Sequence, residues 1–486
     1  MKNIPLALTF NDVLLVPQYS EILPKNVNLN TFLTRNIRLN IPLVSAAMDT
    51  VTEEQMAITM ALHGGIGVVH KNCTPEEQAE MVRQVKRFEN GFIREPVVIS
   101  PDHKVSDVIA IRERYGFKSV PVTEDGTLET KVVGLITRND YFAKHAQKLV
   151  RERMTPSSKL LTAQAPITLS QANDVLEESK HSKLIILNPD GTLHALVTRR
   201  DIEKNEQFPF ASKDKEKRLR VAAAVGPGNN RDERIQKLVD AGVDVLVVDT
   251  AHGDSLGVVQ CVQHIKKHFP KIDVIAGNIG TAEGAKNLIK AGADGVKVGI
   301  GPGSICTTRI IAGVGIPQLS AIMDVAQVAK RHKVPVIADG GIRYSGDIAK
   351  ALAAGATSVM VGSLLAGTSD APGEIIYMEG KTYKYYRGMG SLAAMTKGGK
   401  ERYGQANVAN DKLVPEGIEG KVLYKGDAAH EIFQLSGGLR SSMGYNGAKD
   451  IAEFQKKAKF VQITDSGLRE SHPHDISILK EAPNYR

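Results

Sequence analysis

The sequence predicts an α/β protein whose main domain is a closed (β/α)8 barrel, the TIM-barrel architecture, with a second module inserted into it. One sequence pattern recurs in the C-terminal half: a predicted helix ends in Ala-Gly, and an apolar run follows, as at 241–249, 291–299 and 354–362. Glycine suits the end of a helix, and short apolar runs rich in β-branched residues predict strands buried on both faces. The chain contains eight such runs, and about 150 residues separate the second from the third.

These eight apolar runs are the expected strands of the barrel. They are residues 41–48, 65–70, 219–225, 243–249, 272–278, 294–299, 334–339 and 357–362. Amphipathic stretches such as 347–354 follow most of the runs, and alternating strands and helices are typical of a parallel barrel. An open, doubly wound parallel sheet is the alternative arrangement of the same elements.

The gap between the second and third runs is longer than a βα unit needs and contains an internal repeat. The segment 119–140 recurs at 184–201, and the closing aspartates of the two copies are offset by 61 residues. Each copy reads as helix, strand, Asp-Gly turn, strand and helix. We therefore expect a barrel made of 1–91 and 208–486, and an inserted module made of the copies 92–150 and 151–207.

The tandem repeat resembles a CBS pair (cystathionine-β-synthase type), a module that in many proteins binds adenine nucleotides between its two copies. The resemblance implies that Thr137 with Asp140, and Thr198 with Asp201, contact a ribose, and that ATP or GTP binds there. The pattern Thr-x-x-Asp at a strand-to-helix junction is equally typical of an N-terminal helix cap. Both interpretations stay open.

Composition and charge narrow the classes of function. The 486 residues include 62 Lys and Arg against 54 Asp and Glu, a formal net charge of +8. The two signs are interleaved, as at 213–218, so a nucleic-acid-binding arm is not indicated. Three cysteines, Cys73, Cys261 and Cys306, are far apart and lack metal-ligand spacing, which argues against structural zinc or a disulfide framework. Without a signal peptide or an apolar run of 18 residues, the chain is expected to be cytoplasmic, with no membrane partner.

The segment 299–308, Gly-Ile-Gly-Pro-Gly-Ser-Ile-Cys-Thr-Thr, follows the sixth run and is the main candidate for an active-site loop. Active sites of this fold lie at the carboxyl ends of the strands. Alternating glycines let the backbone turn sharply and expose its amides. Because such dipoles favour a thiolate, we expect Cys306 to be a nucleophile, whereas Cys73 and Cys261 are expected to be incidental thiols.

Two further loops, 339–343 and 362–363, follow the last two runs. Loops at these positions of the barrel usually cradle phosphate with backbone N–H groups, so we expect a phosphorylated substrate or cofactor. Asp339 is placed to accept hydrogen bonds from a ribose diol, with a helix-capping role as the alternative. The sequence has no G-x-G-x-x-G opening a βαβ unit, no Walker A and no H-E-x-x-H motif, so a dinucleotide, if one is used, binds outside a Rossmann fold.

Five features together resemble the inosine 5′-monophosphate (IMP) dehydrogenase / GMP reductase family: the segments 297–308, 338–343 and 386–391, the CBS-like insert, and the chain length. The resemblance spans nearly the whole chain. It implies oxidation of IMP to xanthosine 5′-monophosphate (XMP) by NAD, in the synthesis of guanine nucleotides. It further implies that the Cys306 thiolate attacks carbon 2 of the purine, that hydride then passes to nicotinamide, and that water releases XMP from a thioimidate.

The resemblance also implies a set of binding residues. Those expected on the phosphate and ribose are Ser304, Gly341, Gly362, Ser363, Tyr386 and, on the ribose, Asp339. Those expected around the base are Met48, Met360, Met389, Gly390 and Glu416. Those expected on the nicotinamide side of NAD are Asp249, Asn278, Gly299 and Gly301, with Lys297 as a permitted variant of a nearby basic residue. From the residues alone, the methionines would be taken as core packing.

The segment 381–425 is rich in Gly, Lys and Tyr and has little periodicity, so we expect it to be a mobile flap over the site. The resemblance implies that Arg402 of this flap activates water for hydrolysis, assisted by Tyr403 and Thr308. A guanidinium is a poor base, and the residue chemistry alone would favour Glu416 in that role.

A monovalent cation, usually potassium, and an oligomer are also implied by the resemblance. The expected cation ligands are the carbonyl groups of Gly301, Gly303 and Cys306, completed by Glu470, Ser471 and His472 of a neighbouring subunit. A site shared in this way requires assembly, which is a homotetramer in this family. The sequence leaves open whether tetramers pair into octamers.

Three other functions are weighed against this one. A GMP reductase shares the barrel and the cysteine loop but performs a reductive deamination with NADPH, and it lacks the Arg-Tyr flap and typically the insert. A flavin mononucleotide enzyme would use the glycine loops as a cradle. A nucleotide sensor with an idle barrel is disfavoured by the intact Cys306, Thr308, Arg402 and Tyr403.

Overall fold

The computed structural model describes residues 4–88, 93, 96–115, 117–199, 207–228 and 231–485. The chain forms two compact units: one contains Met1–Lys86, Phe210–Ser212 and Arg220–Arg486, and the other contains Arg87–Pro209 and Lys213–Leu219. The expected domain boundary at 91–92 lies outside the described residues. No helix in the described part of the chain is both long and apolar enough to cross a membrane.

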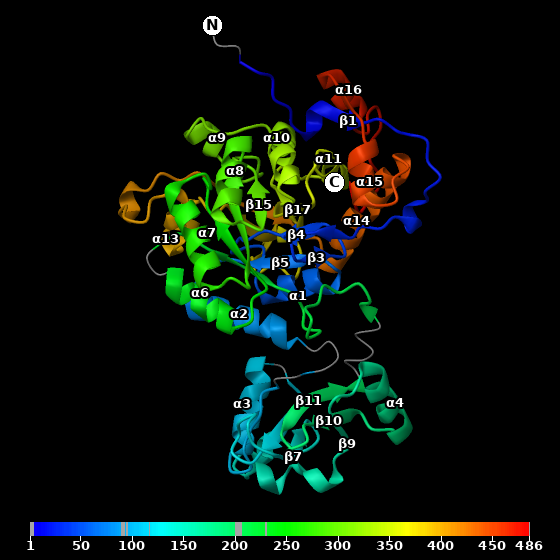
Figure 1. Cartoon of the computed structure of the whole chain (residues 1–486), viewed down its shortest axis with the longest axis vertical. Helices are drawn as coiled ribbons and strands as arrows, with labels where there is room; N and C mark the ends of the chain where they lie inside the picture. Colours follow the sequence, from blue (N-terminus) through cyan, green and yellow to red (C-terminus); the bar gives the residue numbers. More distant parts are fainter. Residues whose placement is uncertain are drawn as a thin grey trace. The chain divides into compact units, whose positions relative to one another are not determined.

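A closed barrel of eight parallel strands forms the centre of the first unit (Figure 1). The strands are β4 (Leu43–Ser45), β5 (Ile66–Val69), β12 (Ala222–Val225), β13 (Val245–Asp249), β14 (Asp273–Ile279), β15 (Gly295–Val298), β16 (Val336–Asp339) and β17 (Ser358–Val361). Their order is β12-β13-β14-β15-β16-β17-β4-β5, and β5 closes the ring by pairing Val69 with Ala223 of β12. Each strand matches one predicted run to within a few residues, so the predicted barrel is confirmed and the open-sheet alternative is wrong.

Helices pack around the outside of the barrel (Figure 1). They are α1 (Glu54–Leu62), α2 (Pro75–Arg87), α6 (Arg231–Asp240), α7 (Leu256–His268), α8 (Ala282–Ala291), α10 (Gln318–Arg331) and α11 (Ser345–Ala353). In α8 the Thr281 side chain accepts a hydrogen bond from the Gly284 amide at 3.1 Å, and Gly292 ends the helix at a φ of +106°. A left-handed residue at a helix end favours glycine, which explains why the Ala-Gly pattern marks these boundaries.

Side chains of the barrel strands are buried on both faces, inside the ring and beneath the helices. Val247, Val298 and Ile337 are almost fully buried. This burial explains why the strands read as continuous apolar runs rather than as alternating patterns. Gly67 of β5 allows α1 to approach closely, since a Cβ there would lie 2.6 Å from the Ala57 Cα.

Further elements complete the first unit. Those before the barrel are η1 (Phe10–Asp12), β1 (Val13–Leu15), η2 (Pro24–Asn26), β2 (Thr31–Phe32) and β3 (Arg38–Leu39). The short helices after β15 and β17 are α9 (Thr308–Ile311) and α12 (Ser363–Ala366). Those that follow are β18 (Ile375–Met378), β19 (Lys381–Arg387), α13 (Leu392–Lys397), η6 (Gly399–Tyr403), η7 (Asn410–Lys412), β20 (Glu419–Leu423), α14 (Ala428–Tyr445), α15 (Ile451–Lys457), β21 (Phe460–Gln462) and α16 (Asp465–Glu470). The segment expected to be an irregular flap therefore begins and ends with strands, β19 and β20, which pair antiparallel.

The second unit contains two similar halves. The first has α3 (Val105–Tyr115), β6 (Ser119–Thr123), β7 (Val132–Thr137), η3 (Ala143–His145), η4 (Val150–Glu152), β8 (Thr155–Pro156) and η5 (Ser157–Lys159). The second has β9 (Thr162–Gln164), α4 (Leu169–Ser179), β10 (Lys183–Leu187) and β11 (Leu193–Thr198). Each half has an antiparallel pair joined by a turn at its Asp-Gly sequence, where Gly126 and Gly191 have φ values of +86° and +88°. The repeat predicted from the sequence is thus visible as repeated structure.

Candidate active site

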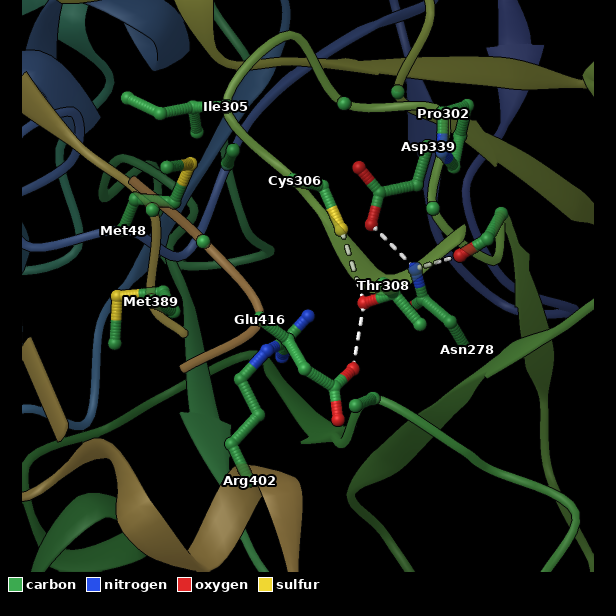
Figure 2. Close-up of a pocket in the computed structure, with 18 of the residues that line it drawn as sticks. Met48, Asn278, Pro302, Ile305, Cys306, Thr308, Asp339, Met389, Arg402 and Glu416 are labelled. Atoms are coloured by element: carbon green, nitrogen blue, oxygen red, sulfur yellow. Dashed lines mark hydrogen bonds between the residues drawn. The ribbon is translucent and has the colours of Figure 1, made fainter. Parts of the chain in front are cut away.

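Cys306 lies at the carboxyl end of the barrel, on the loop that leads from β15 into α9. Its Sγ is 3.2 Å from the Thr308 hydroxyl, which donates a hydrogen bond of 2.7 Å to the Glu416 carboxylate (Figure 2). Because that donation leaves the Thr308 oxygen able to accept, the thiol proton has a path toward Glu416. The three side chains form a chain through which the sulfur can lose or regain a proton.

Glycine and arginine fix the shape of this loop. Gly299 has a φ of +153°, and a Cβ there would overlap the Asp339 carbonyl of β16. The Arg309 guanidinium donates to the Ile300 carbonyl at 3.1 Å and to the Ile316 carbonyl at 2.6 Å. Arg309 therefore ties the start of the loop to the segment that follows α9, a role that its position in the sequence did not reveal.

A buried ammonium lies between the residues expected on the two riboses. Lys297 of β15 is 1% exposed, and its Nζ is 2.9 Å from Asp249 Oδ1 and 2.6 Å from Asp339 Oδ2. It also donates to the Asn278 side-chain oxygen, while the Asn278 amide donates to Asp339 at 3.0 Å (Figure 2). With the flap docked, Lys297 and Arg402 balance the charges of Asp249 and Asp339. Without Arg402 the cluster has one excess negative charge, which favours ligands that bring hydroxyl groups or positive charge. The sequence offered one signal for this role, a lysine in an otherwise apolar strand.

The flap is docked in the mouth of the barrel. The Arg402 guanidinium forms an ion pair with Asp249, and its carbonyl accepts a hydrogen bond from the Ala251 amide at 3.0 Å. The half-buried Tyr403 packs against Gly390, where a Cβ would lie 2.6 Å from its ring. Burial raises the pKa of Tyr403, so its phenol keeps its proton and can donate. Arg402 thus pairs with the Asp249 carboxylate, which was expected on the nicotinamide side of NAD.

All five residues expected on a phosphate line one cavity beside Asp339. This cavity adjoins the one around Cys306, and Asp339 lines both. The five residues are Ser304, Gly341, Gly362, Ser363 and Tyr386. Arg309 and Arg343 also line it and add positive charge that the sequence analysis did not assign. Burial raises the pKa of Tyr386 to about 12, so its hydroxyl remains a donor. The arrangement suits a dianion held by hydroxyl and amide donors.

Most of the other expected residues line the cavity around Cys306. They are Met48, Asp249, Asn278, Gly299, Gly301, Gly303, Thr308, Met360, Met389, Arg402, Tyr403 and Glu416. Gly390 lies behind Tyr403 and accepts a hydrogen bond from the Glu416 amide at 3.0 Å. Within their own chain, Glu470, Ser471 and His472, all described residues, do not line it; His472 instead contacts the Tyr485 hydroxyl at 2.7 Å.

An ion pair behind the site holds the loops that carry the methionines. The Arg387 guanidinium of β19 meets the Asp49 carboxylate through two nitrogens, and the Asn72 amide donates to Asp49 at 2.7 Å. Burial acts to raise the pKa of Asp49, but hydrogen bonds from Arg387 and Asn72 outweigh it and hold the pKa below its usual value. Since Asp49 follows Met48 and Arg387 precedes the 388–391 loop, this pair fixes both walls around the expected base.

In the second unit, Thr137 and Thr198 line one cavity. Its cationic lining residues are Arg87, Lys118, Arg138, Lys183 and Arg199. The Thr137 amide and hydroxyl both donate to Asp140 at 2.8 Å, as in a helix cap. The α-helix expected after Thr137 does not form in the described segment 138–146, which contains turns and η3. Asp201 lies outside the described residues.

Comparison with known proteins places this geometry in a family. A family model described as "IMP dehydrogenase / GMP reductase domain" matches residues 7–474. Inosine-5′-monophosphate dehydrogenase of Aquifex aeolicus is 55% identical over 488 residues, covering 100% of this chain and 98% of that protein. Its counterpart in Helicobacter pylori is 52% identical over 486 residues, covering 100% of both.

A solved structure agrees with these matches. A cysteine-to-alanine variant of GMP reductase from Trypanosoma brucei, in complex with guanosine 5′-monophosphate, superposes with a TM-score of 0.90 at 42% identity, covering 98% of this chain and 99% of that one. The barrel, the cysteine loop and the full-length similarity lead to one conclusion: the chain belongs to the IMP dehydrogenase / GMP reductase family.

Proposed function

We propose that this chain is an NAD-dependent oxidoreductase that converts IMP to XMP through a covalent bond to Cys306. The observation that carries the proposal is the chain from the Cys306 thiol through Thr308 to Glu416, which opens into a cavity that adjoins the expected phosphate site. A nucleophilic thiol needs a group that takes its proton, and the Glu416 carboxylate, reached through Thr308, is such a group. The full-length relatives named inosine-5′-monophosphate dehydrogenase support the same reaction.

The proposed substrate pose follows the two adjoining cavities. The phosphate would be held by Ser304, Gly341, Gly362, Ser363 and Tyr386, with positive charge from Arg309 and Arg343. The Asp339 carboxylate would accept hydrogen bonds from the ribose diol. The base would lie among Met48, Met360 and Met389, which places carbon 2 of the purine within reach of the sulfur.

Asp249, Asn278, Gly299 and Gly301 would hold the nicotinamide end of NAD. The residues fit this group, because the Asp249 and Asn278 side chains line the cavity beside Cys306 and the buried Lys297 ammonium orients both. When bound, NAD supplies the acceptor for the hydride that leaves carbon 2. Since the flap residue Arg402 meets Asp249 in this structure, flap and cofactor would use the same carboxylate in turn.

The protein's own residues would manage the protons. The thiol proton passes by way of Thr308 to Glu416 as the sulfur bonds to carbon 2, and loss of hydride leaves a thioimidate. Water then adds at carbon 2, the carbon–sulfur bond breaks, XMP leaves and the thiol regains a proton. With the flap docked, Arg402 and Tyr403 would orient that water. Its proton would go either to Arg402 or to Glu416, the latter after Glu416 has released the thiol proton to solvent. Glu416 is the better base by its chemistry.

A potassium site at the carbonyl groups of Gly301, Gly303 and Cys306 is part of the proposal. The loop fits such an ion, since Gly301 has a φ of +77° and the Cys306 amide donates to the Gly303 carbonyl at 3.1 Å, closing a tight turn. Carbonyl oxygens suit a weakly hydrated cation. Glu470, Ser471 and His472 of a neighbouring copy would complete the site, which requires assembly. The proposed assembly is the homotetramer of this family.

ATP or GTP is the proposed ligand of the cavity in the second unit. Five cationic side chains line it together with Thr137 and Thr198, which suits a polyphosphate chain and a ribose. Calorimetry on the full chain with each nucleotide tests this proposal. No heat with any purine nucleotide would leave the unit a structural or partner-binding module.

The decisive test of the main reaction is spectroscopic. Mixing the protein with IMP and NAD should raise the absorbance of NADH, and intact mass spectrometry during turnover should find a nucleotide on Cys306. Cys306→Ala should abolish both signals. GMP reductase is the second candidate, favoured by the similar solved structure; consumption of NADPH with GMP, without any oxidation of IMP, would establish that activity instead.

A further inference from the structure

The residue before Arg402 docks in a separate polar notch at the mouth of the barrel. Glu401 Oε2 lies 3.3 Å from the Lys71 ammonium, which follows β5, and Glu401 Oε1 accepts a hydrogen bond of 2.5 Å from the Gly228 amide, which follows β12. The side chains of Lys71 and Glu401 are 9% and 27% exposed. This notch takes no part in the reaction proposed above.

We infer that Lys71 and Glu401 form a latch that holds the flap closed, and that both are positioning residues for the hydrolytic step. The inference rests on the proposed function. In the closed state the latch keeps Arg402 on Asp249 and Tyr403 against Gly390, the arrangement in which water is to be activated. With the latch open, Asp249 is free for the cofactor.

Charge fixes the register of this docking. Two adjacent flap residues of opposite sign meet two barrel groups of opposite sign, Glu401 on Lys71 and Arg402 on Asp249. Lys71 follows β5 and Asp249 is the last residue of β13, and β12 lies between these two strands. A shift of one residue along the flap would place Glu401 beside Asp249, where like charges repel. The Glu401–Lys71 ion pair therefore determines where Arg402 and Tyr403 bind in the barrel mouth.

The notch is shaped for a carboxylate. A Cβ at Gly226 would overlap the Lys71 ammonium, and one at Gly228 would lie 2.6 Å from Glu401 Oε1. Burial and the nearby cations Arg402 and Arg234 lower the pKa of Lys71, whereas the Glu401 carboxylate acts in the opposite direction. Glu401 thus supplies the negative charge that this crowded, positive environment needs when the flap is closed.

Single-turnover kinetics separate the latch from the chemistry. Glu401→Gln and Lys71→Gln should leave the NADH burst unchanged, while the Cys306 adduct, followed by quench and mass spectrometry, should decay about tenfold more slowly, because one partly buried charge-assisted contact is lost. Inhibition by excess NAD should appear at about tenfold lower concentration. The double variant should be no slower than either single one. Glu283→Gln, on the exposed face of α8, is the matched control and should behave as wild type.

A second measurement does not depend on turnover. Trypsin cleaves after Lys400 and Arg402, so both latch variants should be cut within the flap about tenfold faster than wild type, while circular dichroism stays unchanged. Adduct decay and flap cleavage at wild-type rates would overturn the latch. An equal slowing of the NADH burst and of adduct decay would also overturn the latch, because it would indicate a merely structural role. Absence of any NADH formation from IMP and NAD in the wild type would instead refute the proposed function itself.

Discussion

Replacing Lys297 by methionine tests whether one ammonium organises both ribose sites. Methionine keeps an unbranched side chain of similar size but removes the charge and three donors. The Lys297 Nζ lies 2.9 Å from Asp249 and 2.6 Å from Asp339 and is almost fully buried. Removing one partner of a buried ion pair costs about 3–5 kcal/mol, because a charge is left uncompensated. We expect the free energy of unfolding of the barrel to fall by about that amount at pH 7.

Urea unfolding followed by circular dichroism measures this loss, and calorimetry measures binding of IMP. Binding of IMP and the KM for NAD should both worsen, because Asp339 and Asp249 lose their shared partner. Lys286→Met on α8 is the matched control: its side chain is 55% exposed, so its effect should stay within about 0.5 kcal/mol. A loss below about 1 kcal/mol for Lys297→Met, with both ligands bound as in the wild type, would refute the reasoning.

Three other outcomes are expected. Thr308→Val preserves the shape of the side chain but breaks the proton path from Cys306 to Glu416, so stopped-flow absorbance should show NADH formation slowed by about 10²–10⁴-fold; a change below threefold would contradict the path. Replacing potassium by tetramethylammonium should lower kcat, and adding potassium back should restore it; equal rates in both salts would remove the cation from the proposal. Burial opposes ionisation of Asp49, but hydrogen bonds from Arg387 and Asn72 hold its folded-state pKa below the ordinary 3.8, so this pair stabilises the fold above that pH. The Tm of Asp49→Asn should therefore be lower than that of the wild type at pH 7, and the gap should narrow as the pH falls below 3.8 through the folded-state pKa. A constant gap in Tm would exclude that linkage.

The barrel was predictable because its strands are buried on both faces. Continuous runs such as 243–249 can bury their apolar side chains only inside a covered parallel sheet. The glycine that follows several of the preceding helices, such as Gly242 and Gly292, marks where the strand begins. The flap was predicted less well. Strands β19 and β20 have exposed lysines, Lys381 and Lys421, and half-buried tyrosines such as Tyr383. Contacts across the pair, such as the Lys421 ammonium 4.3 Å from the Tyr383 ring centroid, replace the burial that sequence patterns detect.

The sequence predicted most of the residues that line the two cavities, but not the network of contacts among them. Glycine spacing indicated where the Cys306 loop turns, yet the contacts of Lys297 with Asp249 and Asp339 join strand ends far apart in sequence, and only the closed ring brings them together. The same holds for Arg309, whose carbonyl partners depend on the fold of the loop itself. In the second unit, the pattern at Thr137 indicated a hydrogen bond to Asp140 correctly, but the local chain continues as a turn instead of an α-helix.

The cavity around Cys306 is assembled from the ends of separate barrel strands, so no single short segment of the chain contains it. Before the ring is complete, β4 must find β17 and β5 must find β12, partners that are hundreds of residues away in one case and across the whole insert in the other. Pairings between such distant segments form slowly. An early folding intermediate can therefore contain nearly all of its helices and still not bind IMP. During refolding, the recovery of IMP binding would report when the last strand pairing of the barrel forms.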